Sequence, residues 1–188
     1  VLKTDVEQGR KRLTGVYAVL GGKTYFSGKT TANGDELWVT DGTTDGTLML
    51  KDINPGSSPS NPHFFFTVGS KVLFVAEDGT SGSELWATDG TAAGTVLLKD
   101  IETGAGSSVP GARDNISLGS GYSGDGMNVI NGKLYFSAST TAAGREPWVS
   151  DGTSVGTQMM SDVRPGATGS MALDAGPFLP AGGKVVFP

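Results

Sequence analysis

Three glutamates recur in this sequence, each two residues before a tryptophan: Glu36 with Trp38, Glu84 with Trp86, and Glu146 with Trp148. In a strand, residues two apart share a face, so each carboxylate lies on the same face as its indole ring. Paired carboxylates run glycoside hydrolysis, and an aromatic ring can stack on a sugar. A catalytic pair should occur once, however, and these residues recur in every copy. We therefore expect the glutamates to bond to neighbouring backbone and the tryptophans to pack between sheets.

A loop with the pattern Asp-Gly-Thr-x-x-Gly-Thr follows each of these strands, beginning at Asp41, Asp89 and Asp151. Aspartate accepts backbone N–H groups across such a turn, which predicts a rigid hairpin. Glycine tolerates the positive φ of tight turns, and we expect it at both glycines of each loop: Gly42, Gly46, Gly90, Gly94, Gly152 and Gly156. The alternative is a calcium loop. Asp45 makes the first copy more acidic, but Ala93 and Val155 replace it elsewhere, so no cofactor is predicted and calcium stays the alternative.

The single histidine, His63, begins a run of three phenylalanines and has no counterpart in the other copies. It could act with a carboxylate, but no Gly-x-Ser-x-Gly nucleophile elbow accompanies it. A structural or exposed histidine is therefore the favoured interpretation, and we predict no catalytic residue. The sequence holds no cysteine, which excludes thiolate nucleophiles and cysteine zinc sites. One histidine also excludes a metal site built on several imidazoles of one chain.

An insertion over residues 102–126 interrupts the repeat, rich in glycine and serine. Loops on a rigid scaffold carry function, so a binding site would most naturally be added here. Its candidate binding residues suit hydrogen bonding to a glycan or a protein: Arg113, Asp114, Asn115, Tyr122 and Asp125. The competing interpretation is a flexible connection between units. Asn115-Ile116-Ser117 also matches the short pattern of an N-glycosylation site.

These residues are positioned by a single repeat array. Residues 1–9 match the end of a unit, residues 16–53, 63–101 and 127–163 are units, residues 102–126 are the inserted loop, and residues 176–188 begin a further unit. Each unit predicts four short strands, the fourth over residues 48–53, 96–101 and 158–163, with residues 54–61 as a linker. No segment shows sustained 3.6-residue apolar periodicity, so no long helix is expected. Four antiparallel strands in roughly 50 residues indicate an all-β fold of β-propeller blades; a sandwich or a solenoid is the alternative.

The strands at the two ends do not add up to a complete unit, because together they lack a Glu-Leu-Trp strand. We therefore expect a partial propeller, one completed by further chain, or one that pairs with another chain. Open blade edges would otherwise invite self-association, since an edge strand presents unpaired backbone groups.

Composition narrows the classes of partner. The chain has 188 residues with 30 glycines, 18% charged residues and a formal net charge of -5. No extended basic stripe is present, which argues against nucleic acid and against docking on an anionic membrane. No apolar run approaches the roughly 20 residues of a membrane-spanning helix, so no membrane insertion is expected.

The repeats resemble the bacterial ELWxxDGT repeat family. Glu36-Leu37-Trp38 with Asp41-Gly42-Thr43, and Glu84-Leu85-Trp86 with Asp89-Gly90-Thr91, match its motif in full. The third copy departs from it at Pro147, which cannot donate to a strand ladder, so an altered third strand is expected there. The resemblance implies large propeller-like proteins that are secreted or on the bacterial cell surface, with no general enzymatic activity.

The predicted function is accordingly that of a non-catalytic extracellular or cell-surface propeller module, a scaffold or an adhesive module that binds a protein or glycan. The alternative is a part of a polysaccharide-degrading propeller, either a lyase or a glycoside hydrolase. Convergence of acidic, arginine or tyrosine residues that break the repeat would favour the enzyme.

Overall fold

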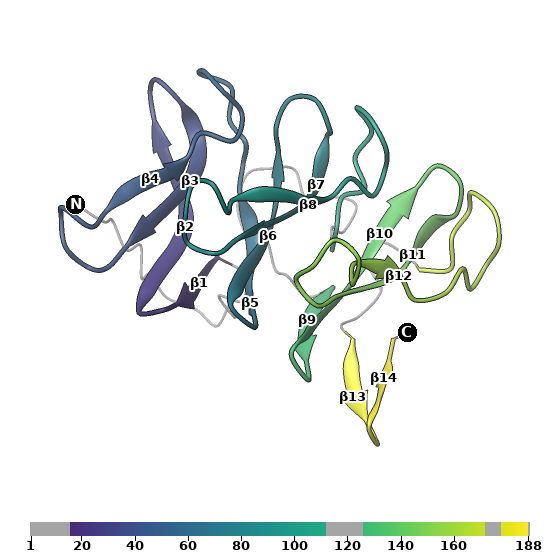
Figure 1. Cartoon of the computed structure of the whole chain (residues 1–188). Helices are drawn as coiled ribbons and strands as arrows, with labels where there is room; N and C mark the ends of the chain where they lie inside the picture. The colour runs from purple at the N-terminus through teal and green to yellow at the C-terminus, as the bar shows by residue number, and fades with distance from the viewer. Residues whose placement is uncertain (1–15, 112–125, 172–177, 188) are drawn as a thin grey trace, which may run out of the picture.

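The computed structural model describes residues 16–111, 126–171 and 178–187. Within these ranges the protein is all-β, and its strands form four antiparallel sheets that follow one another along the chain (Figure 1). No helix in the described ranges has the length and apolar character needed to cross a membrane.

Each of the first two units forms one four-stranded sheet in the order of the sequence. The first sheet contains β1 (Tyr17–Leu20), β2 (Lys23–Thr30), β3 (Gly34–Thr40) and β4 (Leu48–Lys51). The second contains β5 (His63–Val68), β6 (Lys71–Glu77), β7 (Ser83–Thr88) and β8 (Val96–Lys99). The predicted four antiparallel strands per unit are confirmed.

The third unit repeats this order, and a two-stranded sheet follows it. The third sheet contains β9 (Met127–Ile130), β10 (Lys133–Thr140), β11 (Gly144–Ser150) and β12 (Gln158–Met159). The fourth sheet pairs β13 (Leu179–Ala181) with β14 (Lys184–Val186).

Both faces of the second sheet are apolar, and each face belongs to a different core. Successive strand residues point to opposite faces. Leu73, Val75 and Leu85 therefore pack in the core shared with the third sheet. Their neighbours Phe74 and Trp86 pack in the core shared with the first sheet. A strand buried on both faces explains the almost uninterrupted apolar run of β6.

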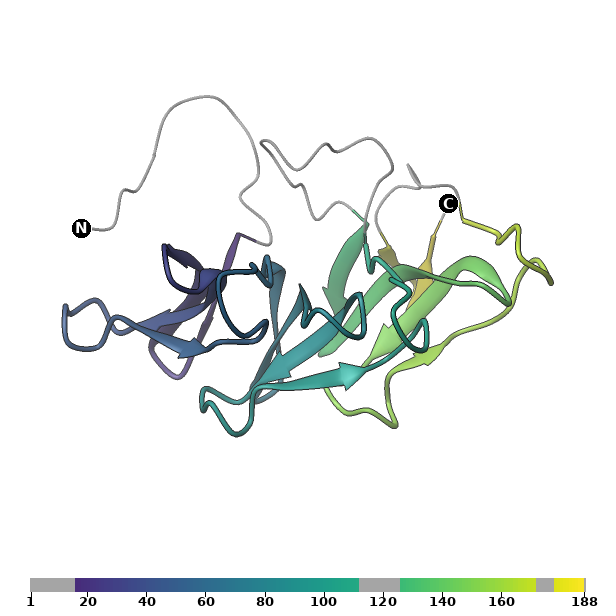
Figure 2. The ribbon, with the colours of Figure 1, turned by 90° about the horizontal axis from the view of Figure 1, so that it is seen from above.

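The sheets thus stack face to face, as Figure 2 shows from above. We call the face that carries the tryptophan the back face and the opposite one the forward face. The forward face of each sheet packs on the back face of the next. Tyr25, Leu37 and Val39 of the first sheet meet Phe65, Phe74 and Trp86 of the second, and the second meets the third in the same way.

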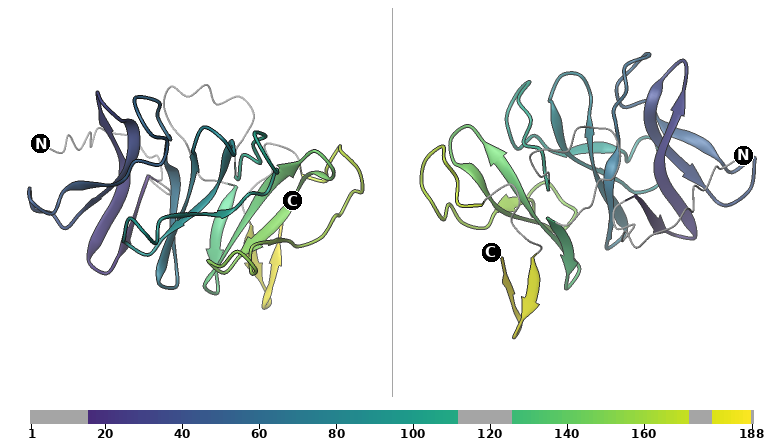
Figure 3. Two further views of the ribbon diagram at one scale, coloured as in Figure 1. Left: turned by 45° about the horizontal axis from the view of Figure 1, so that its top comes forward. Right: turned by 180° about the vertical axis from the view of Figure 1, so that it is seen from behind.

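The same packing continues into the two-stranded sheet. Ile130 and Tyr135 on the forward face of the third sheet pack with Phe178, Val185 and Phe187. The first strands of successive sheets contact one another, β1 with β5, β5 with β9 and β9 with β13. Figure 3 shows the row of sheets in two further views.

Each fourth strand is shorter than predicted, because β4 and β8 end at Lys51 and Lys99 rather than at residues 53 and 101. Ile53 and Ile101 are buried beyond the strand ends, where their N–H groups bond to glutamate carboxylates. These isoleucines belong to the core although they are not paired in the sheet. The apolar sequence pattern therefore continued beyond the last paired residue, and the predicted strands were too long.

The expectation of an altered third strand at Pro147 is wrong in its location. β11 keeps seven residues, and Pro147 pairs with Ser137 of β10. The change falls on the outer strand instead: β12 has two residues, paired with Trp148 and Val149. Leu37 and Leu85 each pair with a lysine of the fourth strand, and a proline at that position has no N–H for this outer ladder.

Replacing Trp86 with alanine should lower the free energy of unfolding far more than the same change at Trp38. Trp86 is buried between two sheets, so we expect a loss of about 3–5 kcal/mol from Trp86→Ala. Trp38 is half-buried on the back face of the first sheet, so we expect about 1–2 kcal/mol. Urea unfolding of both variants measures the difference, and equal losses would contradict the stacking order.

Candidate functional site

Glu84 is a fully buried carboxylate at the start of β7, and its oxygens accept four hydrogen bonds. The backbone N–H groups of Ile101, Glu102 and Ser108 donate at 3.1, 3.3 and 2.8 Å, and the Ser108 hydroxyl donates at 2.5 Å. These donors lie after strand β8, in the segment that leads to the next sheet. The carboxylate therefore fastens the end of its own unit to the start of the next.

The other two repeated glutamates do the same work. Glu36 accepts hydrogen bonds from the N–H groups of Ile53 and Ser60 at 2.7 and 2.9 Å, and from the Ser60 hydroxyl at 2.6 Å. Glu146 accepts from the Val163 N–H at 3.1 Å and from the Ser170 hydroxyl at 2.5 Å. The prediction that these glutamates bond to neighbouring backbone is confirmed.

A serine 24 residues after each glutamate completes this arrangement, which we call the carboxylate clasp: Ser60, Ser108 and Ser170. The first two serines also bond to the following sheet. The carbonyl of Ser60 accepts from the Glu77 N–H at 3.0 Å, and that of Ser108 accepts from the Ser139 N–H at 2.9 Å. Residues 54–61, predicted as a linker, are therefore a connection that is hydrogen-bonded to both of the sheets it joins.

Burial sets the electrostatics of the clasp. Desolvation raises the pKa of Glu36 and Glu84, and the hydrogen bonds from the clasp serines and backbone oppose that rise. Each glutamate is enclosed within its own unit and reaches no surface groove, because its side chain is fully buried. The three glutamates belong to three different sheets, so they do not form with one another the convergent pair that glycoside hydrolysis requires.

The Asp-Gly-Thr-x-x-Gly-Thr hairpins are closed by their own side chains. Asp41 Oδ1 accepts from the Thr43 N–H at 2.9 Å and from the Thr43 hydroxyl at 2.6 Å. The Thr43 hydroxyl in turn accepts from the Gly46 N–H at 2.9 Å, and the Thr47 hydroxyl donates to the Thr43 carbonyl at 2.6 Å. The same bonds recur around Asp89 and Asp151. The bonds from the threonines lower the pKa of all three aspartates.

The two glycines of each hairpin serve different purposes, which corrects one expectation. The first has the predicted positive φ, 93° at Gly42 and 95° at Gly90. The second, such as Gly46 or Gly94, does not. A Cβ on Gly94 would stand 2.1 Å from Asp89 Oδ1, so glycine is needed there because the aspartate folds over the backbone.

The calcium alternative gains no support from a ligand cluster. Among the described residues, no group of three or more His, Cys, Asp or Glu side chains is placed to hold a metal ion. Calcium binding by the hairpins stays the untested alternative to the predicted absence of a cofactor.

His63 lies at an irregularity in the β5–β6 ladder. Its Nδ1 is 2.7 Å from the Asn61 carbonyl, and its ring meets that of Phe64 edge-on at 4.7 Å. Burial lowers the pKa of His63, which favours the neutral ring. Phe64 itself has a φ of 56°, a costly conformation for an aromatic residue. His63 therefore belongs to a strained bulge at the start of its sheet.

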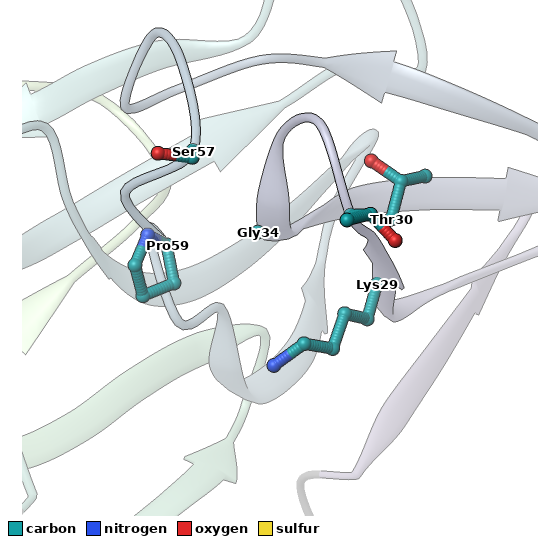
Figure 4. Close-up of a pocket in the computed structure, with 6 residues that line it drawn as sticks. Lys29, Thr30, Gly34, Ser57 and Pro59 are labelled. Atoms are coloured by element: carbon teal, nitrogen blue, oxygen red, sulfur yellow. The ribbon is translucent and has the colours of Figure 1, made fainter.

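Two grooves open where the second strand of a unit turns into the third, against the segment that leaves that unit. The first, of about 480 Å³, is drawn in Figure 4 and is lined by Lys29, Thr30, Thr31, Gly34, Ser57 and Pro59. The second, of about 780 Å³, lies at the matching place in the third unit, between residues 102–109, 139–145 and 167–171. Both are open surface grooves lined by polar side chains together with apolar surface, at a place where loops on a scaffold meet.

The second groove carries charge that the repeat does not. Glu102 on its wall accepts from the Thr141 backbone N–H at 2.7 Å and from the Thr141 hydroxyl. These bonds lower the pKa of Glu102, so it is ionised at neutral pH. Arg145 lines the same groove, and its Nη1 donates to Ser137 Oγ at 2.8 Å. A carboxylate with threonine hydroxyls beside it can exchange hydrogen bonds with a polar ligand.

The predicted binding residues of the insertion, Arg113, Asp114, Asn115, Tyr122 and Asp125, lie outside the described residues. The insertion is described up to Gly111 and again at Gly126. The Gly111 N–H donates to the Ser137 carbonyl at 2.8 Å, and a Cβ on Gly126 would stand 3.3 Å from the Gly111 carbonyl. Gly111 and Gly126 therefore lie beside Ser137, whose hydroxyl also accepts a hydrogen bond from Arg145.

Sequence reasoning missed Arg145, and it placed Glu102 at the start of the insertion without naming it as a binding residue. A signal was present, because Arg145 precedes the repeated glutamate where the other copies have Asp35 and Ser83. Glu102 likewise follows Ile101 where the first copy has Asn54. These breaks in the repeat gave no hint of a shared groove, since 43 residues of sequence separate them and only the fold brings them together.

Comparisons of this chain with protein-family models, with curated proteins and with solved structures found no match.

Glu84→Gln should destabilise the protein strongly although it preserves shape. The amide can accept at only one of its two polar atoms, so buried N–H donors of the clasp lose their partners. We expect a loss of roughly 2–4 kcal/mol in urea unfolding. Asp45→Asn, at an exposed carboxylate, is the matched control and should change stability little. Equal stability of the two variants would disprove the clasp.

Gly94→Ala should open the second hairpin, because the new methyl group overlaps the Asp89 carboxylate. We expect faster amide hydrogen exchange at Thr91 and Gly94, whose N–H groups bond within the hairpin. Ala93→Gly, at the adjacent position, serves as the control and should leave the exchange at Thr91 unchanged. Protection at Thr91 that survives Gly94→Ala would contradict this geometry.

Proposed function

We propose that this chain is a non-catalytic β-propeller-type repeat module, a scaffold whose loops bind a protein or glycan partner. One observation carries the proposal: the repeated acidic residues are used by the fold itself. Three glutamates hold the carboxylate clasps and three aspartates close the hairpins. Residues committed to such bonds are structural, so binding is left to the positions at which the repeat breaks.

The propeller assignment has support from the order of the strands. Each sheet runs in sequence order from its first strand outward, and successive first strands contact one another. Propeller blades have this arrangement around an axis, with short protected edges. The described sheets form an open row, so a complete propeller needs further blades.

We further propose membership of the ELWxxDGT repeat family and an extracellular or cell-surface location in a bacterium. The motif residues support this proposal by having structural tasks that explain their recurrence. Glu84 forms the clasp, Trp86 fills the core between sheets, and Asp89 closes the hairpin.

The second groove is where we place partner binding. It combines Glu102, Arg145 and the hydroxyls of Thr140 and Thr141, and both ends of the insertion lie beside it. The Glu102 carboxylate and the threonine hydroxyls offer acceptors and donors that sugar hydroxyls need, and the buried Arg145 supports the wall of the groove through its bonds to Ser137 and Val109. The first groove has the same position in the repeat but lacks both the arginine and the glutamate.

Incubation with a panel of acidic and neutral polysaccharides tests this function. We expect binding without new reducing ends or unsaturated products, and at least about tenfold weaker binding after Glu102→Gln, because a charged acceptor is lost. Lys29→Gln in the first groove is the matched control and should bind as the unchanged protein does. Turnover of a polysaccharide that is abolished by changing Glu102, Asp114 or Tyr122 would instead establish the enzyme.

A further inference from the structure

Two Asn-Gly dipeptides occur in this chain, Asn33-Gly34 and Asn131-Gly132, and each lies at a turn between two strands. An asparagine before a glycine can react with its own backbone. The glycine nitrogen attacks the carbon of the side-chain amide, and the missing Cβ of glycine leaves that approach unhindered. The reacting atoms must come within about 3–3.5 Å of each other, so the fold decides which of the two asparagines reacts.

The fold restrains Asn33 on both sides of the bond that would form. Its Oδ1 accepts from the Thr30 hydroxyl at 3.1 Å, and its Nδ2 donates to Asp52 Oδ2 at 2.9 Å. Gly34 is buried and paired with Thr30, and a Cβ on it would stand 2.8 Å from the Pro59 Cα. The Asn33 amide therefore cannot swing toward the Gly34 nitrogen unless this corner of the first unit opens.

Asn131 lacks these restraints. It forms with Gly132 the turn between β9 and β10, where both residues are exposed. Their φ values of 51° and 74° are those of the two-residue turn that Asn-Gly favours. Among the described residues, none bonds to the Asn131 side chain, and none lies within 4 Å of where a Cβ on Gly132 would stand. Opening the closing pair of the ladder, Ile130 and Lys133, is enough to free the turn.

We propose that Asn131 is a site of spontaneous backbone modification and that the fold protects Asn33 from the same reaction. The Gly132 nitrogen bonds to the Asn131 Cγ, the bond from Cγ to the amide nitrogen breaks, and ammonia leaves with the proton of the Gly132 N–H. Water then adds to either carbonyl of the succinimide ring and opens it. The products are aspartate and isoaspartate at position 131, and water is the one co-reactant.

Isoaspartate at this turn would disturb the junction between the third and fourth sheets. It carries the main chain through Cβ and Cγ, which lengthens a turn built for two residues. Ile130 stands directly beside the turn, is 6% exposed and packs with Met171 and Phe178. A longer turn loosens the pairing of β9 with β10 next to this core, so we expect faster amide hydrogen exchange in β9 of the modified chain.

Incubation of the full chain in mildly alkaline buffer, followed by peptide mapping, tests the proposal. Trypsin cuts after lysine and arginine, which places Asn33 in the peptide of residues 30–51 and Asn131 in that of residues 114–133. Fragmentation then assigns the mass increase of an amide that becomes an acid to one asparagine. We expect the product at Asn131 to form at least about tenfold faster than at Asn33, since one exposed turn opens more readily than a buried corner.

Two controls isolate the contribution of the fold. In concentrated urea both dipeptides are unrestrained, so Asn33 and Asn131 should react at similar rates. Asn131→Gly gives the turn the Gly-Gly sequence that Gly21-Gly22 and Gly182-Gly183 already have, with positive φ at each glycine. This variant keeps the turn and cannot react. Its β9 amides should stay protected through the incubation, whereas those of the unchanged chain should lose protection as isoaspartate accumulates.

Other results overturn the proposal. An Asn131 that stays unmodified rejects it, and so does modification of Asn33 at the same rate in the folded chain. A difference between the two asparagines that persists in urea assigns it to local sequence and not to the fold. Equal loss of β9 protection in the incubated Asn131→Gly variant disproves the effect of isoaspartate. Neither asparagine lines the second groove, so these outcomes are independent of the proposed binding function.

Discussion

The carboxylate clasp is the interaction on which the rest of this structure depends. A buried carboxylate must be surrounded by donors, because an unpaired charge in a protein interior is costly. Glu84 obtains its donors from the end of its own unit and from Ser108, which also bonds to the third sheet. One side chain thus determines where the outer strand stops and where the chain enters the next sheet.

The repeated acidic residues are used by the fold, which separates them from the residues that are available for binding. The clasp occupies the repeated glutamates and the hairpins occupy the repeated aspartates. The two grooves form at the same place in the first and third units, because the clasp holds the departing segment against the turn between the second and third strands. The two grooves differ in chemistry because the residues that line them are not repeated from unit to unit. Arg145 and Glu102 are examples. The fold therefore fixes where a groove lies in the unit, and the non-repeated residues determine which side chains line it.

The strands and the roles of the repeated residues were predictable, because both are written in local patterns. A short apolar run between two turns located β6, and repetition of Glu84 and Asp89 argued for structure rather than catalysis. The clasp serines were not predicted, because a segment rich in serine, glycine and proline is typical of a linker. The second glycine of each hairpin was misjudged because its requirement comes from a side chain folding over it. Groove residues were missed because they approach only in the folded chain.

By itself the sequence determined the element type, the number of strands in each unit and the residues that recur, because strand periodicity and turn chemistry act over a few neighbouring positions. Only the tertiary structure decided which faces are covered. Trp38 and Trp86 have the same local sequence, yet Trp86 is buried against a preceding sheet and Trp38 is half-buried. The physical reason is that burial depends on which sheet packs against a face, and a local pattern does not record that neighbour.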